Sequence, residues 1–333
     1  MDISSRNIFD DSIVIDGTCP LAGYKDYYTL WMDGNVTAIA PDIATNDDIK
    51  TTIKRFAIWH RKIESNPKLH LVLSVDDIYR AKREGKLGII MHFQNTRPFD
   101  NDLNLISIYH KLGLRIVQLC YNVKNSVGDG CAEKTDCGLS IFGEKLIKEM
   151  ERVGIVIDLS HTGYKTTMEA IEVCTKPPVF SHSNVKALCN SERNLTDDQI
   201  KKIAAKGGII GLNGYPAFVA KKQTPTVDDL LDHADYIINL VGIDHVGLGI
   251  DYWEGMAEIS DSEEAWQIYD ELISTGAWSA EMYPPPPWHY PKGIDTPDKL
   301  PNLVEAMIKR GYSLDNIKKI LGENWLRIFK QVW

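Results

Sequence analysis

Short apolar runs recur along the chain, and each is followed by a stretch with the spacing of an amphipathic helix. The runs are rich in β-branched residues and almost wholly apolar, which is typical of strands buried on both faces of a parallel sheet. Glycines often precede them, as helix C-caps that lead into a strand do. The expected strands are Ser12–Asp16, Asn35–Ala40, Leu87–Phe93, Arg115–Leu119, Ile155–Leu159, Val179–Ser181, Gly208–Leu212 and His245–Ile250.

Helices are expected between these strands. Thr196 and Gln199 have the spacing of a capping box, which indicates a helix start. Repeated strand–helix units predict an α/β fold, a (β/α)₈ TIM barrel, as a single domain over residues 1–333. An extended loop region at about 252–298 and C-terminal helices at 299–333 complete it. The expected helices include Ser140–Val153, Thr166–Cys174, Thr196–Lys206 and Val227–Leu240.

Composition and charge exclude several classes of partner. The formal net charge is -9 and no Lys/Arg-dense stripe is present, which argues against a nucleic-acid surface. No run approaches the roughly 18 apolar residues of a membrane span. The amino-terminal sequence lacks the cationic start and apolar core of a secretory signal, so a cytoplasmic location is expected.

Polar residues at the carboxyl ends of barrel strands carry most of the functional information, because these ends converge on one cavity. Two strands in succession end near a histidine, His161 and His182, and the last ends at Asp251. Neutral imidazoles can hold a metal ion, and a carboxylate can take a proton from bound water. A single strand-end histidine is more often structural, but the pairing in a barrel favours a hydrolytic metal centre.

Several segments match a known family. They lie at strand ends and near the carboxyl terminus, and together they resemble the membrane (renal) dipeptidase family of zinc peptidases. The resemblance implies a barrel of the metal-dependent amidohydrolase-like kind. It also implies that His161 and His182 hold one zinc ion, that Asp251 orients the attacking water, and that Arg193 binds the substrate carboxylate. Barrels of this family commonly pair, so a homodimer is expected. The matching segments are Gly154–His161, Phe180–Ser183, Arg193–Asp198, Gly247–Tyr252 and Gly322–Arg327.

Four positions depart from the family pattern, and all four belong to its active site. The family's first-strand His-x-Asp is replaced by Thr18 and Pro20, which supply neither ligand. Its bridging glutamate aligns with Gln94, a neutral amide that is a poor bridge between two dications. A histidine that contacts the scissile group aligns with Tyr121, whose phenol can donate to a developing oxyanion. We therefore expect at most one zinc ion per chain, held by His161, His182 and Gln94, and slow cleavage of ordinary dipeptides.

Three functions remain open from the sequence. The first is a dipeptidase-like metallohydrolase that cleaves the amide or peptide bond of a small carboxylate-bearing substrate, with Asp251 and Tyr121 as catalytic residues. The second is a barrel enzyme with a changed reaction, with or without a metal, on a small zwitterionic or betaine-like compound. The third is a binding protein without catalysis. Metal content separates the first function from the others, and turnover separates the second from the third.

The loops after the strands are dense in aromatic residues, among them Tyr252 and Trp253. Together with Asn213 and Arg193, these two are the expected substrate-binding residues. One interpretation is an aromatic cage for a cationic group, which ring faces attract. The other is that the rings bury one another beneath long loops, as Trp and Tyr usually do.

Overall fold

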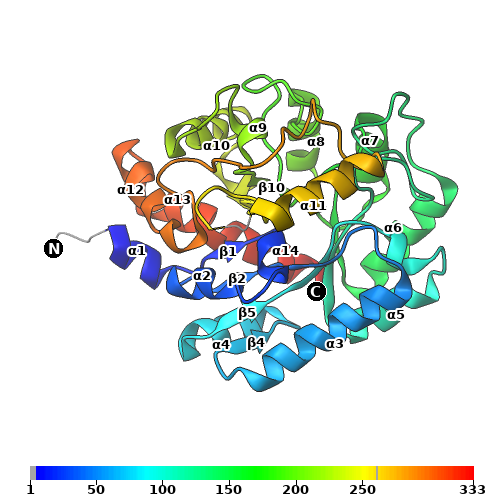
Figure 1. Cartoon of the computed structure of the whole chain (residues 1–333), viewed down its shortest axis with the longest axis horizontal. Coiled ribbons are helices and arrows are strands. Elements are labelled where there is room, and N and C mark those ends of the chain that lie inside the picture. The colour runs from blue at the N-terminus through cyan, green and yellow to red at the C-terminus, as the bar shows by residue number, and fades with distance from the viewer. Residues whose placement is uncertain (1–4, 260–261) are drawn as a thin grey trace.

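Parallel strands form the centre of the molecule in a computed structural model that describes residues 5–259 and 262–333 (Figure 1). Residues 1–4 lie outside the described residues. They belong to the amino-terminal segment in which no secretory signal is expected. Every strand pairing is parallel, as the continuous apolar runs predict. The strands are β1 (Ile15–Asp16), β2 (Ala38–Ile39), β3 (Asp42–Ala44), β4 (Leu69–Leu71), β5 (Leu87–Ile89), β6 (Met91–Phe93), β7 (Leu114–Gln118), β8 (Val156–Asp158), β9 (Val179–Phe180), β10 (Ile209–Leu212) and β11 (Val246–Leu248).

The sheet closes into a barrel. Pro41, which has no N–H to donate, lies between β2 and β3, and Ile90 lies between β5 and β6. Because β2 pairs with β5 and β3 pairs with β6, β2 and β3 together form one interrupted barrel strand. β5 and β6 together form the interrupted strand next to it. β11 pairs with β1, which completes the ring, and β4 is added outside it on β5. The expected (β/α)₈ barrel is confirmed, and β4 is a strand that the sequence pattern did not predict.

Helices follow most of the strands and cover the outside of the barrel. The capping box at Thr196 and Gln199 is present at the start of α8, and Gly154 ends α6 with a φ of 91°. The four helices expected from the sequence are present with boundaries shifted by at most two residues. The outer helices are α3 (Ile49–Ser65), α4 (Val75–Glu84), α5 (Asn104–Lys111), α6 (Ile141–Val153), α7 (Tyr164–Val173), α8 (Asp197–Ala205) and α10 (Val227–Val241).

The remaining helices belong to the chain ends and to loops. α11 crosses the front of the barrel in the orientation of Figure 1. Among the described residues, no helix combines the length and apolarity that crossing a bilayer requires. These helices are α1 (Ser5–Asp11), α2 (Tyr28–Asp33), α9 (Pro216–Val219), α11 (Ser262–Ser274), α12 (Asn302–Lys309), α13 (Leu314–Lys318) and α14 (Asn324–Val332).

The carboxyl-terminal helix α14 is part of the core. Trp325 and Phe329 are fully buried against apolar side chains of most barrel strands. The Trp325 indole donates to the carbonyl of Leu248 at 2.9 Å. A side chain at Gly17 would approach the Trp325 ring to 2.1 Å, so glycine is required where this ring meets the first strand.

Candidate active site

Sharp turns follow the strands at the candidate site. Asn122, His161 and Asp251 all have left-handed backbone, with φ of 59°, 61° and 62°. Residues with a side chain avoid this region, at a cost of roughly 1–2 kcal/mol each. Such strain is commonly stored at functional sites. The three turns follow β7, β8 and β11, and they bring residues from distant parts of the sequence together.

His161 is oriented by Asn122. The Asn122 amide nitrogen donates to the carbonyl of Ala277 at 2.9 Å, so its oxygen faces His161 Nδ1 at 2.7 Å. That oxygen can only accept, which places a proton on His161 Nδ1 and leaves a lone pair on Nε2. His161 Nε2 lies 2.8 Å from His182 Nε2.

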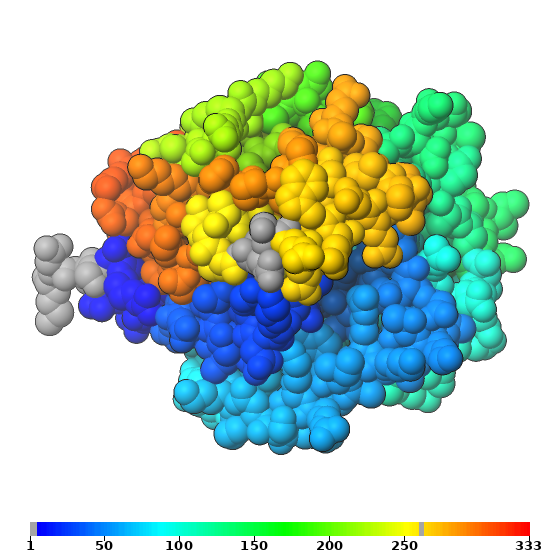
Figure 2. Space-filling model, in the orientation of Figure 1, coloured from blue at the N-terminus to red at the C-terminus, as the bar shows by residue number. Residues whose placement is uncertain are grey.

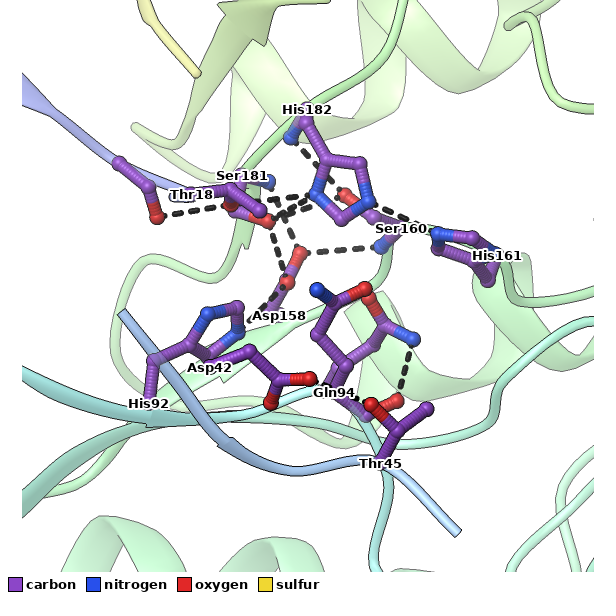
Figure 3. A network of polar contacts seen from close by, with 12 residues as sticks. Thr18, Asp42, Thr45, His92, Gln94, Asp158, Ser160, His161, Ser181 and His182 are labelled. Carbon is purple, nitrogen blue, oxygen red and sulfur yellow. Dashed lines mark hydrogen bonds and ion pairs between the residues drawn. The ribbon is translucent and has the colours of Figure 1, made fainter. Parts of the chain in front are cut away.

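A second chain of hydrogen bonds orients His182 (Figure 3). Its Nδ1 lies 2.6 Å from Ser181 Oγ, and this hydroxyl donates to Asp158 Oδ2 at 2.5 Å. Asp158 Oδ1 accepts from the backbone N–H groups of Ser160 and Ser181. Because Ser181 gives its proton to Asp158, it accepts from His182 Nδ1 and leaves the lone pair on Nε2. Burial raises the pKa of Asp158, but His92, His182 and Ser181 lower it more, so this carboxyl titrates well below its usual range.

The two Nε2 lone pairs therefore point at each other, which fits a single shared cation. Burial and the nearby Arg193 hold the pKa of both imidazoles well below the usual histidine value, which favours a metal ion over a proton. Two zinc–nitrogen bonds of about 2.0–2.1 Å separate the nitrogens by about 3.3 Å at a tetrahedral angle, so the rings would part slightly. Among the described residues, no group of three or more His, Cys, Asp or Glu side chains is placed to hold a metal ion. The pair thus fits one ion whose other ligands are of a different type.

Asp251 and Arg193 lie in the same buried region. Asp251 Oδ2 accepts from Asn213 Nδ2 at 3.2 Å, and Oδ1 has no partner among the described residues. Burial raises the pKa of Asp251 to about 8, against the lowering influence of Arg193 and Asn213. The Arg193 guanidinium donates to the carbonyl of His182 at 3.1 Å and lies over the Phe218 ring. No carboxylate of the described residues forms an ion pair with Arg193, which leaves its charge available to an anionic ligand.

Tyr121 covers the histidine pair. Its ring stacks on His161 with centroids 4.2 Å apart, and its hydroxyl accepts from Trp278 Nε1 at 2.9 Å. The hydroxyl keeps its own proton, which can be donated to a ligand. Burial raises the pKa of Tyr121 well above its usual value, so the phenol stays protonated.

Gln94, His92 and Asp42 form the opposite side of the site, on the strands β3 and β6 (Figure 3). Gln94 is buried, and its amide nitrogen has no partner among the described residues. Neither ring nitrogen of His92 has a hydrogen bond there, and its Nε2 lies 3.5 Å from Asp158 Oδ2. Thr18, at the family's histidine position, donates to the carbonyl of Gly17 at 2.7 Å and lies 3.2 Å from His182 Nδ1.

The aromatic residues of the loops pack on one another. Tyr252 donates to the carbonyl of Ile294 at 2.6 Å, and its ring lies between Trp31 and Tyr290. Trp278 stacks on Tyr283 with ring centroids 4.2 Å apart. These contacts support the packing interpretation and not a cage for a quaternary ammonium group.

The chain matches the family model described as "Membrane dipeptidase (Peptidase family M19)" over residues 32–282 and 288–333. It belongs to this family. A 30% identical relative from Klebsiella pneumoniae, "Uncharacterized protein in pqqA 5'region", aligns over 86% of this chain and 98% of its own length. "Dipeptidase tcpJ" of Claviceps purpurea is 28% identical over 87% of this chain. The chain spans only 62% of the length of tcpJ.

Solved structures agree on the fold of this family member. An amidohydrolase from Pseudomonas aeruginosa superposes with a TM-score of 0.87 at 33% identity, over 99% of both chains. A metallo peptidase from Rhodobacter sphaeroides, "liganded with phosphinate mimic of dipeptide L-Ala-D-Ala", gives a TM-score of 0.79 at 21% identity, over 97% of this chain and 100% of that one. At 21% identity, the likeness to the metallo peptidase supports the fold alone.

The structure thus brings together residues from several strand ends that the sequence singled out. The contacts above connect six of these residues, whereas Tyr252 packs behind them. The six are His161, His182, Tyr121, Arg193, Asn213 and Asp251. Asp158, which orients His182 through Ser181, was not predicted as a site residue from the sequence. A carboxylate inside an otherwise apolar strand, Val156–Asp158, was the available signal.

Proposed function

We propose that the chain is a dipeptidase-like, metal-dependent hydrolase that cleaves the amide bond of a small substrate bearing a carboxylate. The observation that carries the proposal is the histidine pair, whose Nε2 atoms converge at 2.8 Å while their Nδ1 atoms are bound elsewhere. Membership of the membrane dipeptidase family supports the same conclusion.

The proposed metal is one zinc ion per chain, held by His161, His182 and Gln94 with water. A bound zinc ion supplies a Lewis acid and lowers the pKa of a coordinated water. His161 and His182 offer neutral imidazoles with fixed tautomers, and the hydrogen bonds that their Nδ1–H groups donate to Asn122 and Ser181 hold the rings in place.

Asp251 is proposed to take the proton of the attacking water. Its Oδ1 has no protein partner, and Asn213 holds its Oδ2, so one oxygen is left for the water. Tyr121 would donate its phenolic proton to the oxyanion that forms on the scissile carbonyl.

Arg193 is proposed to bind the substrate carboxylate. It is buried, its Nε has no hydrogen-bond partner among the described residues, and it lies in the loop after β9, over the Phe218 ring of the loop after β10. Trp253, 7% exposed, would form part of the wall, where it packs against Tyr24 and Trp278. Tyr252 would contribute from beneath the surface, since its ring packs against Tyr290.

A hydrolysis assay tests this function. We expect the zinc-loaded protein to release amino acids from small amides with a free carboxylate, at low rates for common dipeptides, and to lose this activity after chelation. If neither dipeptides nor N-acyl amino acids are cleaved by the zinc-loaded protein, the proposal fails. The single-domain organisation, the homodimer and the cytoplasmic location stay predictions, which limited proteolysis, light scattering and cell fractionation would test.

A further inference from the structure

The helix α11 leads into a short segment that turns back toward the barrel. Figure 2 shows α11, in yellow, on the outer surface, where it forms one wall of a cavity of about 520 Å³ beside Tyr121 and Trp253. Gly276 follows α11 with a φ of 72°, a conformation that glycine adopts without strain. The N–H of Trp278 then donates to the carbonyl of Leu272 at 3.0 Å, which ties the turn to the helix. We call residues 277–283 the strap.

The strap is buried at its two ends and exposed in its middle. Ala277, Trp278 and Tyr283 are buried, and the two aromatic side chains are each 3% exposed. Residues 279–281 are exposed. Trp278 and Tyr283 therefore bury their rings, and each also carries a polar atom that needs a hydrogen-bond partner inside the protein.

Trp278 contributes its polar atom to Tyr121. The indole Nε1 donates to the Tyr121 hydroxyl at 2.9 Å, and the Tyr121 ring stacks on His161. A hydroxyl oxygen that accepts one N–H must direct its own O–H elsewhere. The contact with Trp278 therefore restricts the directions in which Tyr121 can donate its proton.

Ala277 and Tyr283 hold the amide of Asn122. The amide nitrogen donates to the carbonyl of Ala277 at 2.9 Å, and the Tyr283 hydroxyl lies 3.0 Å from the same nitrogen. The amide oxygen then faces His161 Nδ1 at 2.7 Å. A flipped amide would place its oxygen against the carbonyl of Ala277 and a donor against His161 Nδ1–H. The strap thus fixes the side of Asn122 that His161 meets.

We propose that the strap positions two residues of the reaction centre. Trp278 directs the Tyr121 proton toward the oxyanion of the substrate, and Tyr283 keeps Asn122 in the orientation that holds His161. This inference rests on the proposed function, because it assigns supporting roles to the partners of Tyr121 and His161. Trp278 and Tyr283 act through Tyr121 and Asn122, so they are positioning residues. Aromatic packing alone would need neither the indole N–H nor the phenol hydroxyl.

Kinetics of the zinc-loaded protein with Ala-Ala tests the role of Trp278. Trp278→Phe should lower kcat roughly 2–10-fold, the size of one hydrogen bond, and leave KM unchanged, because the Tyr121 proton is needed only in the transition state. Trp288→Phe is the matched control. Trp288 is also 3% exposed and contacts Trp278, but its Nε1 donates to the carbonyl of Pro284 at 2.7 Å. An equal fall in kcat for Trp288→Phe would assign the effect to packing and overturn the role of Trp278.

A double-mutant cycle separates positioning from packing. In a Tyr121→Phe background, Trp278→Phe should cause no further fall in kcat, because the hydroxyl that Trp278 directs is gone. The same fall in both backgrounds would show that Trp278 acts independently of Tyr121 and would overturn its proposed role.

Zinc affinity tests the role of Tyr283 without any turnover. Tyr283→Phe should weaken zinc binding about 10-fold, at the lower end of the effect of groups that orient a metal ligand. Tyr109→Phe is the control, since this buried phenol donates to the carbonyl of Pro98 at 3.2 Å, and it should leave the affinity unchanged. If Trp278→Phe does not fold, the zinc affinity of Tyr283→Phe decides.

These measurements distinguish a failure of the strap from a failure of the proposed function. Weaker zinc binding by Tyr283→Phe in a protein that cleaves no amide supports the strap and rejects the function. Hydrolysis that is unchanged in Trp278→Phe, together with unchanged zinc affinity in Tyr283→Phe, overturns the strap and leaves the function standing. Absence of both zinc binding and hydrolysis in the wild type overturns both.

Discussion

Three histidines are buried at the mouth of this barrel, and their surroundings differ sharply. Every ring nitrogen of His161 and His182 lies within 3.2 Å of a partner, and the two rings meet at Nε2. His92 has no hydrogen bond at either ring nitrogen among the described residues, although it is equally buried. Hydrogen bonds hold the pair in one orientation and one tautomer, whereas His92 Nε2 has only the longer contact of 3.5 Å with Asp158 Oδ2 among the described residues.

The difference extends to the strands that carry these histidines. On the side of β8 and β9, outer carboxylate and amide groups fix the residues proposed to bind the metal. On the side of β3 and β6, Asp42 and Gln94 each present an atom without a protein partner. Groups with fixed orientation suit a metal ion, which demands geometry. On the other side, Asp42 Oδ1 lacks a donor and the Gln94 amide nitrogen lacks an acceptor, although the Gln94 side chain is proposed to bind the metal through its oxygen. Single substitutions on each side test this difference.

The largest effect is expected from the histidine pair. His182→Ala should abolish hydrolysis and zinc binding, with a loss of activity on the order of 10³-fold or more, because removing only an outer partner of a ligand costs about 10–100-fold. His92→Ala is the matched control and should cost far less. Zinc content and kcat/KM are the measurements, and equal losses in both variants would remove the distinction between the two sides.

Arg193→Ala should weaken substrate binding by roughly 2–5 kcal/mol, as truncation of one partner in a buried, hydrogen-bonded charge pair does. The loss should appear for substrates with a free carboxylate and vanish for their carboxamides. Measuring kcat/KM for both substrate forms provides the control. If the wild type cleaves the carboxamide equally well, Arg193 does not bind the carboxylate.

Asp251 should make the stability of the metal-free protein depend on pH. Its pKa is about 8 in the folded state and about 4 in an unfolded chain. The folded state therefore holds the extra proton between these values, so the stability from Asp251 is complete below about pH 4 and is lost as the pH rises to about 8. Asp251→Asn should remove this fall, on the order of a few kcal/mol, as measured by urea unfolding at pH 5 and pH 8.5. Parallel pH profiles of wild type and variant would contradict the assignment.

Ser181→Ala should have the smallest of these effects, about 10–100-fold in zinc affinity. The substitution removes the hydroxyl that connects His182 Nδ1 to Asp158, so the ring loses its fixed tautomer but keeps its Nε2. A competition titration with a zinc-sensitive dye measures it. An unchanged zinc affinity would show that the ring is held by packing alone.

The barrel could be predicted from the sequence because strands buried on both faces are continuous apolar runs. β4 was missed because Leu69–Leu71 is short, contains His70 and pairs with β5 alone. Family motifs predicted His161, His182 and Asp251, which closely follow β8, β9 and β11, and also Arg193, which lies in the loop between β9 and α8.

The cavity beside Tyr121 and Trp253 could not be predicted in the same way. It depends on how α3 and α11 approach each other across the barrel, and these helices are about 200 residues apart in the chain. The surroundings of Asp42 also depend on tertiary contacts. The sequence does not indicate that Asp47 is bound to Arg55 while one oxygen of Asp42 has no partner among the described residues.

The zinc content of the purified protein tests the central claim most directly. After zinc loading and extensive dialysis, elemental analysis should give about one equivalent per chain for the wild type and none for His161→Ala, because two imidazoles with an amide and water complete one zinc site. Two equivalents in the wild type, or none, would contradict the account.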